Sequence, residues 1–177
     1  MRVKVLEVRR VYSGRAVGLR VERALIEGRV VEREIVEHRG AAVVVPFRED
    51  GKLVLIKQYR RAVNAELIEF PAGTLEPDED AESCARRELL EETGHEARSL
   101  ERLGTFYPAP GYTEEVMHLF MARAVPKEPP SPQDDEEGIR VVTMTLDELM
   151  EMIFRGEVRD AKTVIGAFMI RERMRTV

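Results

Sequence analysis

Residues 73–95 read GTLEPDEDAESCARRELLEETGH, and the interpretation of the whole chain starts from this stretch. Small and apolar residues recur in it at the spacing of one helix face, at Ala81, Cys84, Ala85 and Leu89. Acidic residues at 78–80 suit the first turn of a helix, and Gly94 is a natural helix stop. The stretch therefore predicts a loop followed by a helix that ends at Thr93.

Three glutamates crowd one side of this expected helix. A helical residue turns by about 100°, so Glu88 and Glu92 lie about 40° apart on one face, with Glu91 about 60° to the other side of Glu88. Like charges at this spacing repel one another, and a hard divalent cation with oxygen ligands would offset the repulsion. The alternative is an ordinary acidic helix face that points into solvent.

The spacing of the whole stretch resembles the Nudix box: Gly, five residues, Glu, seven residues, Arg-Glu, an aliphatic, any residue, Glu-Glu, any residue, Gly and an aliphatic. The matching positions are Gly73, Glu79, Arg87, Glu88, Leu89, Glu91, Glu92 and Gly94. Only the last position departs, because His95 stands where an aliphatic residue normally packs after the helix. The chain thus resembles the Nudix hydrolase superfamily.

The resemblance implies a metal site built on these carboxylates. Glu88 and Glu92 would bind magnesium, with manganese as the alternative ion. Glu91 would support them, share a second ion or act as a catalytic carboxylate. The backbone carbonyl of Ala72 would add a further ligand where the chain enters the loop.

The remaining box positions are expected to be structural. Glu79 and Arg87 would form an ion pair that fixes the loop to the helix, although Glu79 is also a plausible plain helix-start acid. Gly73 and Gly94 would allow backbone turns that a side chain would block.

Two arginines outside the box resemble substrate-binding residues of the ADP-ribose pyrophosphatase branch. Arg60 follows Gln58-Tyr59 and precedes the run ELIEFPAG at 66–73, and Arg39 stands just before an apolar run. By resemblance, Arg60 would reach the diphosphate or the terminal ribose, and Arg39 would also contact the substrate. The alternative for both is a surface charge in an arginine-rich chain.

Two loops carry further expectations from the same branch. In the run PAPGYTEE at 108–115, Pro110 and Gly111 would shape the pocket wall and Glu115 would point toward the metals, unless the turn is only a hairpin loop. In the acidic run at 134–137, Glu137 matches best the carboxylate that assists the attacking water, with Glu136 next. A solvated acidic loop is the alternative there.

The implied activity is magnesium-dependent hydrolysis of the diphosphate linkage of ADP-ribose to AMP and ribose 5-phosphate. A different nucleoside-diphosphate sugar or a dinucleotide is the first alternative, because the box contacts only diphosphate and metal. The second is a non-catalytic Nudix module that senses a nucleotide. Such modules typically lose box carboxylates, whereas this chain keeps all four.

Composition excludes several classes of protein. The formal net charge of -5 gives no basic footprint for nucleic acid. The single cysteine, Cys84, allows neither an intrachain disulfide nor a cysteine-based zinc site. Apolar runs such as 41–47 are far too short to span a bilayer, and the charged start lacks the apolar segment of a signal peptide. We therefore expect a cytoplasmic enzyme that acts on a small molecule.

The expected fold class is α/β: a mixed curved sheet flanked by helices, as the resemblance implies. Residues 1–38 read as a β-meander, and by resemblance this layer builds a homodimer; residues 39–177 form the hydrolase domain. Strands are also expected at 41–47, 53–56, 66–70, 98–106, 115–124 and 139–144. Thr145 and Glu148 form a capping box that opens a helix. A last helix starts near Asp160 and is expected to bury Ala161, Val164, Ile165, Phe168 and Met169.

Overall fold

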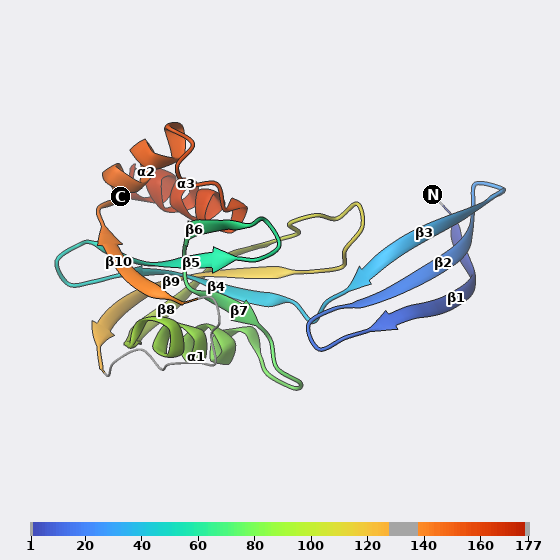
Figure 1. Cartoon of the computed structure of the whole chain (residues 1–177), viewed down its shortest axis with the longest axis horizontal. Helices are drawn as coiled ribbons and strands as arrows, with labels where there is room; N and C mark the ends of the chain where they lie inside the picture. The colour runs from blue at the N-terminus through green and yellow to red at the C-terminus, as the bar shows by residue number, and fades with distance from the viewer. Residues whose placement is uncertain (1, 128–137, 176–177) are drawn as a thin grey trace.

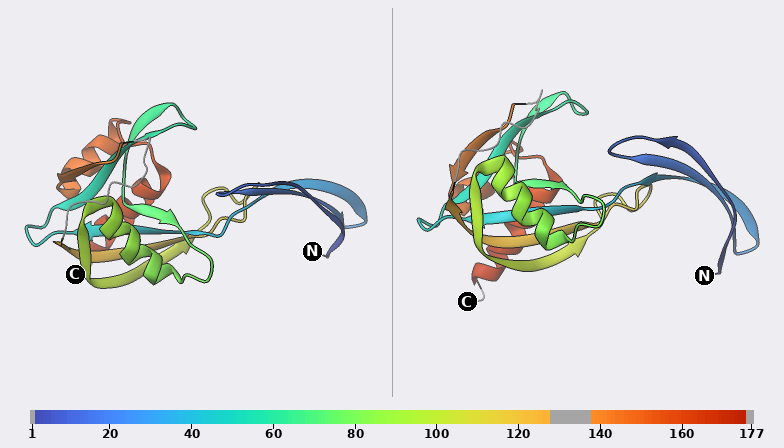
Figure 2. Two further views of the ribbon diagram at one scale, coloured as in Figure 1. Left: turned by 60° about the horizontal axis from the view of Figure 1, so that its bottom comes forward. Right: turned by 90° about the horizontal axis from the view of Figure 1, so that it is seen from below.

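The computed structural model describes residues 2–127 and 138–175 and contains two separate β-sheets. The first is an antiparallel meander in the order β1-β2-β3. Its strands are β1 (Val3–Ser13), β2 (Gly18–Ile26) and β3 (Arg29–Glu37). It projects from the rest of the molecule as an arm (Figures 1 and 2). We call these three strands the arm.

The second sheet has seven strands and forms the body of the molecule. Its main path runs β10-β5-β4-β9-β8, with β6 paired to β5 and β7 paired to β4. Its strands are β4 (Ala41–Phe47), β5 (Leu53–Arg60), β6 (Ala65–Glu69), β7 (Ala72–Thr74), β8 (His95–Phe106), β9 (Met117–Pro126) and β10 (Arg140–Met144). The sheet is mixed because β4 pairs parallel to β9 and antiparallel to β5 and β7.

Helices cover both faces of this sheet (Figure 1). They are α1 (Ala81–Thr93), α2 (Leu146–Phe154) and α3 (Ala161–Arg175). The fully buried strand β4 serves both layers, since Val43 and Val45 pack with α2 and α3 while Ala42 and Val44 pack with α1. The expected mixed sheet flanked by helices, with a meander ahead of it, is therefore confirmed.

The prediction for the buried face of α3 was wrong in part. Ala161, Phe168 and Met169 are exposed, and the buried residues are Lys162, Thr163, Gly166, Ala167 and Ile170. The reason is steric, because a Cβ on Gly166 would lie only 3.0 Å from the Phe70 ring and 3.1 Å from Val45. A face of small residues thus approaches the sheet more closely than the larger apolar face could.

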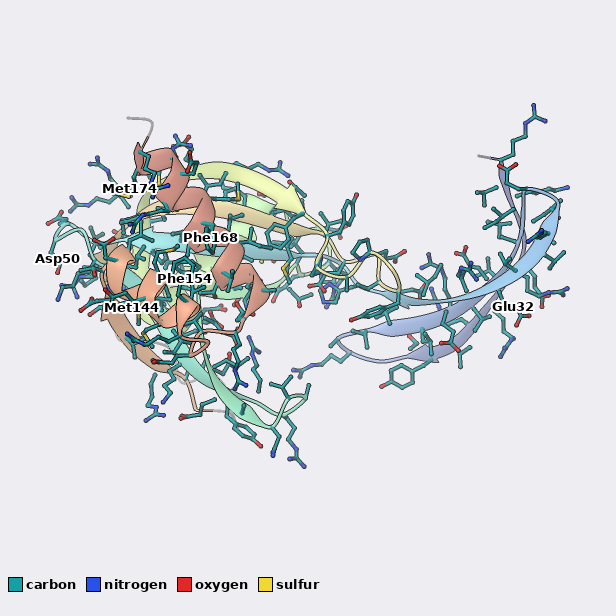
Figure 3. The ribbon with its side chains drawn as sticks, turned by 90° about the horizontal axis from the view of Figure 1, so that it is seen from above. Glu32, Asp50, Met144, Phe154, Phe168 and Met174 are labelled. Atoms are coloured by element: carbon teal, nitrogen blue, oxygen red, sulfur yellow. The ribbon has the colours of Figure 1, made fainter. Side chains whose placement is uncertain are left out.

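The larger apolar residues of α3 lie outward instead. Phe168 meets Phe154 of α2 edge to face, with ring centroids 6.0 Å apart (Figure 3). The capping box before α2 is present, since Thr145 accepts from the backbone N–H of Glu148 and Glu148 accepts from that of Thr145. None of the three described helices is long and apolar enough to cross a membrane.

Candidate functional site

Two carboxylates of α1 are buried, although burial disfavours a charged side chain. Glu88 is 8% exposed and Glu92 is 7% exposed, and the helix packs on β4, β7 and β8. Asp80 caps the start of α1 through backbone N–H groups, and Gly94 ends it with a left-handed φ of 70°. These two caps fix the ends of the helix, and Glu88 and Glu92, one turn apart, face the short strand β7.

Strand β7 lies directly against both carboxylates. The backbone N–H of Ala72 donates to Oε2 of Glu92 at 3.0 Å. A Cβ built on Gly73 would lie 1.9 Å from Oε1 of Glu88, so only glycine leaves room for that carboxylate. Gly73 has no left-handed φ, so the expected reason for this glycine, a special backbone turn, was wrong. Gly94 does have one, as expected.

Burial and mutual repulsion make both carboxyls hard to ionise. Burial is the main cause that raises the pKa of Glu88. Burial, followed by the charge of Glu88, raises the pKa of Glu92 to about 8, against the lowering effect of the hydrogen bond from Ala72. Among the described residues, Arg87 beside Glu88 and the charges of Arg60 and Lys162 acting on Glu92 do not outweigh burial.

Arg87 connects the loop before α1 to the carboxylates on the helix. It makes a two-pronged ion pair with Glu79, with Nε–Oε1 at 2.9 Å and Nη2–Oε2 at 2.8 Å. Its hydrogen bond to Glu79 lowers the pKa of that carboxyl to about 2. Its Nη1 also donates to Glu88 at 2.6 Å and to Glu91 at 3.1 Å. The expected pairing of Glu79 with Arg87 is thus present.

The residues at this site fit a divalent metal ion. Glu88 and Glu92 offer oxygen ligands whose ionised forms are disfavoured until a cation arrives. In residues 2–127 and 138–175, no group of three or more His, Cys, Asp or Glu is arranged to hold a metal ion by itself.

Arg60 lies at the end of β5 and is held by a buried acid. Its Nε and Nη2 donate to the two carboxylate oxygens of Glu69, each at 2.8 Å. The Glu69 side chain is 1% exposed, whereas that of Arg60 is 36% exposed. Burial outweighs the positive charge of Arg60, which acts to lower the pKa of Glu92.

Sequence reasoning missed Glu69 and Lys162 as site residues. Lys162 donates to Glu69 as well, so two cations share one buried carboxylate. The only signal in the sequence was that a helix is expected to start near Asp160, two residues before Lys162. Glu69 and Lys162 lie 93 positions apart in the sequence, so no local pattern reveals their contact.

Arg39 and Glu115 lie where the arm joins the body. Arg39 is exposed and lines a hollow of about 290 Å³ at the base of the arm. Glu115 lies 3.8 Å from Nδ1 of His38, whose Nε2 is 3.5 Å from Oγ1 of Thr74 just after Gly73. The ring of His38 thus lies between Glu115 and Thr74 at the start of the box loop.

The loop between β8 and β9 is tied to the junction between arm and body. The backbone N–H of Val36 donates to the carbonyl of Tyr112 at 2.8 Å, and that of Glu114 donates to the carbonyl of Val36 at 3.2 Å. Pro110 and Gly111 are exposed at the tip of this loop. Glu136 and Glu137, the expected candidates for the base, lie outside the described residues.

His95 shows how the chain accommodates its departure from the box pattern. The residue is 9% exposed, and its Nδ1 lies 2.8 Å from the carbonyl of Thr93. The ring therefore fills the space after the helix and also contacts a carbonyl of the last turn. The departure concerns packing and leaves the carboxylates unaffected.

Comparison with known proteins places these features in a family. A family model described as NUDIX domain matches residues 37–165. A crystal structure described as an ADP compounds hydrolase superposes with a TM-score of 0.83 at 25% identity, covering 99% of this chain and 96% of that one. Both matches confirm the fold class and the resemblance drawn from residues 73–95.

Three curated proteins with different names are similar to the chain over most of its length. The chain is 36% identical to ADP-ribose pyrophosphatase of Bacillus subtilis (strain 168), covering 90% of this chain and 88% of that protein. It is 38% identical to methanol dehydrogenase activator of Bacillus methanolicus, covering 92% and 89%. It is 40% identical to GDP-mannose pyrophosphatase of Cronobacter sakazakii (strain ATCC BAA-894), covering 78% of each.

Proposed function

The chain belongs to the NUDIX family, and we propose that it hydrolyses the diphosphate linkage of ADP-ribose with magnesium, giving AMP and ribose 5-phosphate. One observation carries this proposal: the carboxylates Glu88 and Glu92 on one side of α1 are both buried, and burial raises the pKa of each. Two acids for a cation and one arginine for a phosphate are what a diphosphate substrate requires.

The residues divide the work as follows. Glu88 and Glu92 would hold the metal ion, with Glu91 supporting them and the carbonyl of Ala72 as a further ligand. A bound divalent cation supplies charge neutralisation for the diphosphate and a more acidic water. Arg60 would donate hydrogen bonds to the diphosphate from its guanidinium, which is held by the carboxylate of Glu69.

The bond that breaks joins phosphorus to the oxygen bridging the two phosphates. Water attacks one phosphorus, a carboxylate accepts its proton, and the bridging oxygen leaves with the other phosphate. Our first choice for the carboxylate is Glu137, followed by Glu136, and Glu91 is the choice within the described residues. Arg39, Pro110, Gly111 and Glu115 would border the substrate.

The nature of the sugar and base needs a direct test. The likeness to ADP-ribose pyrophosphatase of Bacillus subtilis favours ADP-ribose as the substrate. The likeness to GDP-mannose pyrophosphatase of Cronobacter sakazakii makes GDP-mannose the first alternative. We would compare kcat/KM for ADP-ribose, GDP-mannose, ADP-glucose, NADH and a diadenosine polyphosphate in magnesium. Preference for ADP-ribose supports the proposal, and preference for another compound keeps the diphosphate chemistry and replaces the substrate. Binding without cleavage of any compound would indicate a nucleotide sensor.

We also propose that residues 1–38 join two copies of the chain. Large apolar side chains are exposed along the arm, at Val3, Val5, Leu6, Val8, Val11, Tyr12, Val17 and Val30. Every residue of β1 is exposed, and the arm extends away from the body (Figure 2). Exposed apolar side chains of this kind are stabilised when a second copy of the chain covers them.

A further inference from the structure

The carboxylate of Glu69 is shared by two cations that reach it from different parts of the chain. Arg60 of β5 approaches side-on through Nε and Nη2. Lys162 of α3 donates through Nζ to Oε2 of Glu69 and, at 2.9 Å, to Oδ1 of Asp160. Burial alone would raise the pKa of Glu69, but Arg60 and Lys162 outweigh it and hold the pKa below its ordinary value.

The start of α3 holds Lys162 in place and grips the chain next to the metal site. Asp160 accepts from the backbone N–H of Thr163 at 3.0 Å and from its hydroxyl at 2.6 Å. The Thr163 hydroxyl in turn accepts from the backbone N–H of Phe70 at 2.8 Å. Phe70 lies two residues before Ala72, whose N–H reaches Glu92. The network therefore ends at the carboxylate pair.

The two cations differ in their exposure. Lys162 has a side chain 10% exposed, whereas that of Arg60 is 36% exposed. Lys162 thus lies on the inner side of Glu69 and Arg60 on the outer side, toward solvent.

We propose that Lys162 is a positioning residue for Arg60, acting through the shared carboxylate of Glu69. This inference rests on the proposed function, in which Arg60 binds the diphosphate. Lys162 would neutralise Glu69 from inside, and Asp160 would neutralise Lys162. The guanidinium of Arg60 is then oriented by Glu69 while its charge remains available to the substrate. Without Lys162, Arg60 would be the main counter-charge of a buried carboxylate and would bind an incoming phosphate less well.

A double-mutant cycle tests the link, because it separates an effect through Arg60 from an independent one. The variants are Lys162→Met, Arg60→Ala and their combination. The readouts are KM and kcat for ADP-ribose, and Kd for its non-hydrolysable α,β-methylene analogue in magnesium by calorimetry. Lys57→Met is the matched control, because Lys57 pairs with the exposed acid Glu66 at 2.9 Å on the same strand as Arg60.

The expected result is a KM effect that depends on Arg60. Loss of one charge-assisted contact corresponds to roughly a 10-fold or larger rise in Kd for Arg60→Ala. Lys162→Met should raise KM and Kd by about 5-fold or more in the wild-type background, and by less than about 2-fold when Arg60 is already alanine. Lys57→Met should change neither constant. An equal rise in both backgrounds would overturn the proposal.

A second variant keeps the test decisive should Lys162→Met fail to fold. Glu69→Gln removes the charge of the shared acceptor and keeps its volume, so it should raise Kd in the wild type and leave it unchanged in Arg60→Ala. A rise in both backgrounds again contradicts the positioning role. If the wild type neither cleaves ADP-ribose nor binds its analogue, the proposed function itself has failed, which is a different result from a cycle without coupling.

Discussion

The carboxylate of Glu88 lies against the backbone of Gly73, where a Cβ atom would stand 1.9 Å from Oε1. The first glycine of the box and Glu88, the first of the proposed metal ligands, are therefore a matched pair. The glycine makes a recess in β7, and the glutamate fills it from α1. This close approach explains why a carboxylate that is 8% exposed still lies beside the chain entering the box loop.

Replacing Gly73 by alanine should displace this carboxylate while leaving the fold intact. Gly73 has no left-handed φ, so alanine is compatible with the backbone, and the three atoms nearest to its Cβ would all belong to the side chain of Glu88. A shift of about 1 Å in a catalytic group can lower the rate by about 100-fold. We expect a loss of kcat of that order with little change in Tm. Full activity in Gly73→Ala would show that Glu88 need not occupy the recess.

Glu92→Gln should abolish turnover and relieve an electrostatic cost in the metal-free protein. Loss of a residue that only hydrogen-bonds to a metal ligand lowers metal affinity or activity by about 10–100-fold. Loss of a ligand itself should therefore lower activity by at least ~100-fold. The pKa of Glu92 is raised to about 8, so the folded state keeps its proton while the unfolded state loses it above its ordinary pKa. Stability therefore falls as pH rises from the ordinary carboxyl range to about 8.

Thermal unfolding in a chelator checks this sign. The Tm of Glu92→Gln minus that of the wild type should grow as pH rises through that window and then level off. Added magnesium should raise the Tm of the wild type and have little effect on the variant. A Tm difference that stays flat with pH would contradict the proposed cost of ionising Glu92.

Glu79→Gln should show the opposite pH dependence. The hydrogen bonds from Arg87 lower the pKa of Glu79 from its ordinary value of 4.5 to about 2. The stabilisation is therefore complete above the ordinary carboxyl pKa and is lost as pH falls from 4.5 to about 2. The wild type should have the higher Tm at pH 7, and the difference should shrink as the solution is acidified through that range. A difference that persists at pH 2 would rule out the ion pair as its source.

The sequence was most informative where a local pattern is enough. Helical spacing alone placed Glu88 and Glu92 on one face of α1, and the spacing of Glu79 and Arg87 matched a pair that the structure contains. The resemblance to the box added the expectation of a metal, which no spacing could show. Strand β4 was also predicted at its observed bounds, because a run of seven apolar residues suits a strand that is buried on both faces.

The sequence was least informative where contacts are distant or steric. The parallel pairing of β4 with β9 joins residues that no local period relates. The buried face of α3 depends on how closely Gly166 approaches Phe70, which the hydrophobicity of Phe168 and Met169 does not reveal. Likewise, Lys162 was assigned no role because its acceptor lies 93 residues away.

A charge on the outer strand of the arm should separate the proposed dimer. Val8 is 55% exposed and lies opposite Glu22 in the β1–β2 register, so Val8→Lys places a cation beside an acid and should leave a folded arm. Light scattering should give about twice 20.2 kDa for the wild type and a mass near 20.2 kDa for the variant. Phe154→Lys is the control, because Phe154 is 75% exposed on α2, away from the arm. A wild-type monomer, or a Val8→Lys dimer, would contradict the role of the arm.

The central claim is that Glu88 and Glu92 form a magnesium-dependent site that splits a diphosphate. The most direct measurement is the quantity of AMP and ribose 5-phosphate released from ADP-ribose by the wild type and by Glu92→Gln, first in magnesium and then in excess chelator. We predict equal amounts of both products from the wild type in magnesium, none in chelator, recovery when magnesium is restored, and almost none from the variant. Equal turnover by Glu92→Gln, or turnover that survives chelation, would contradict the account.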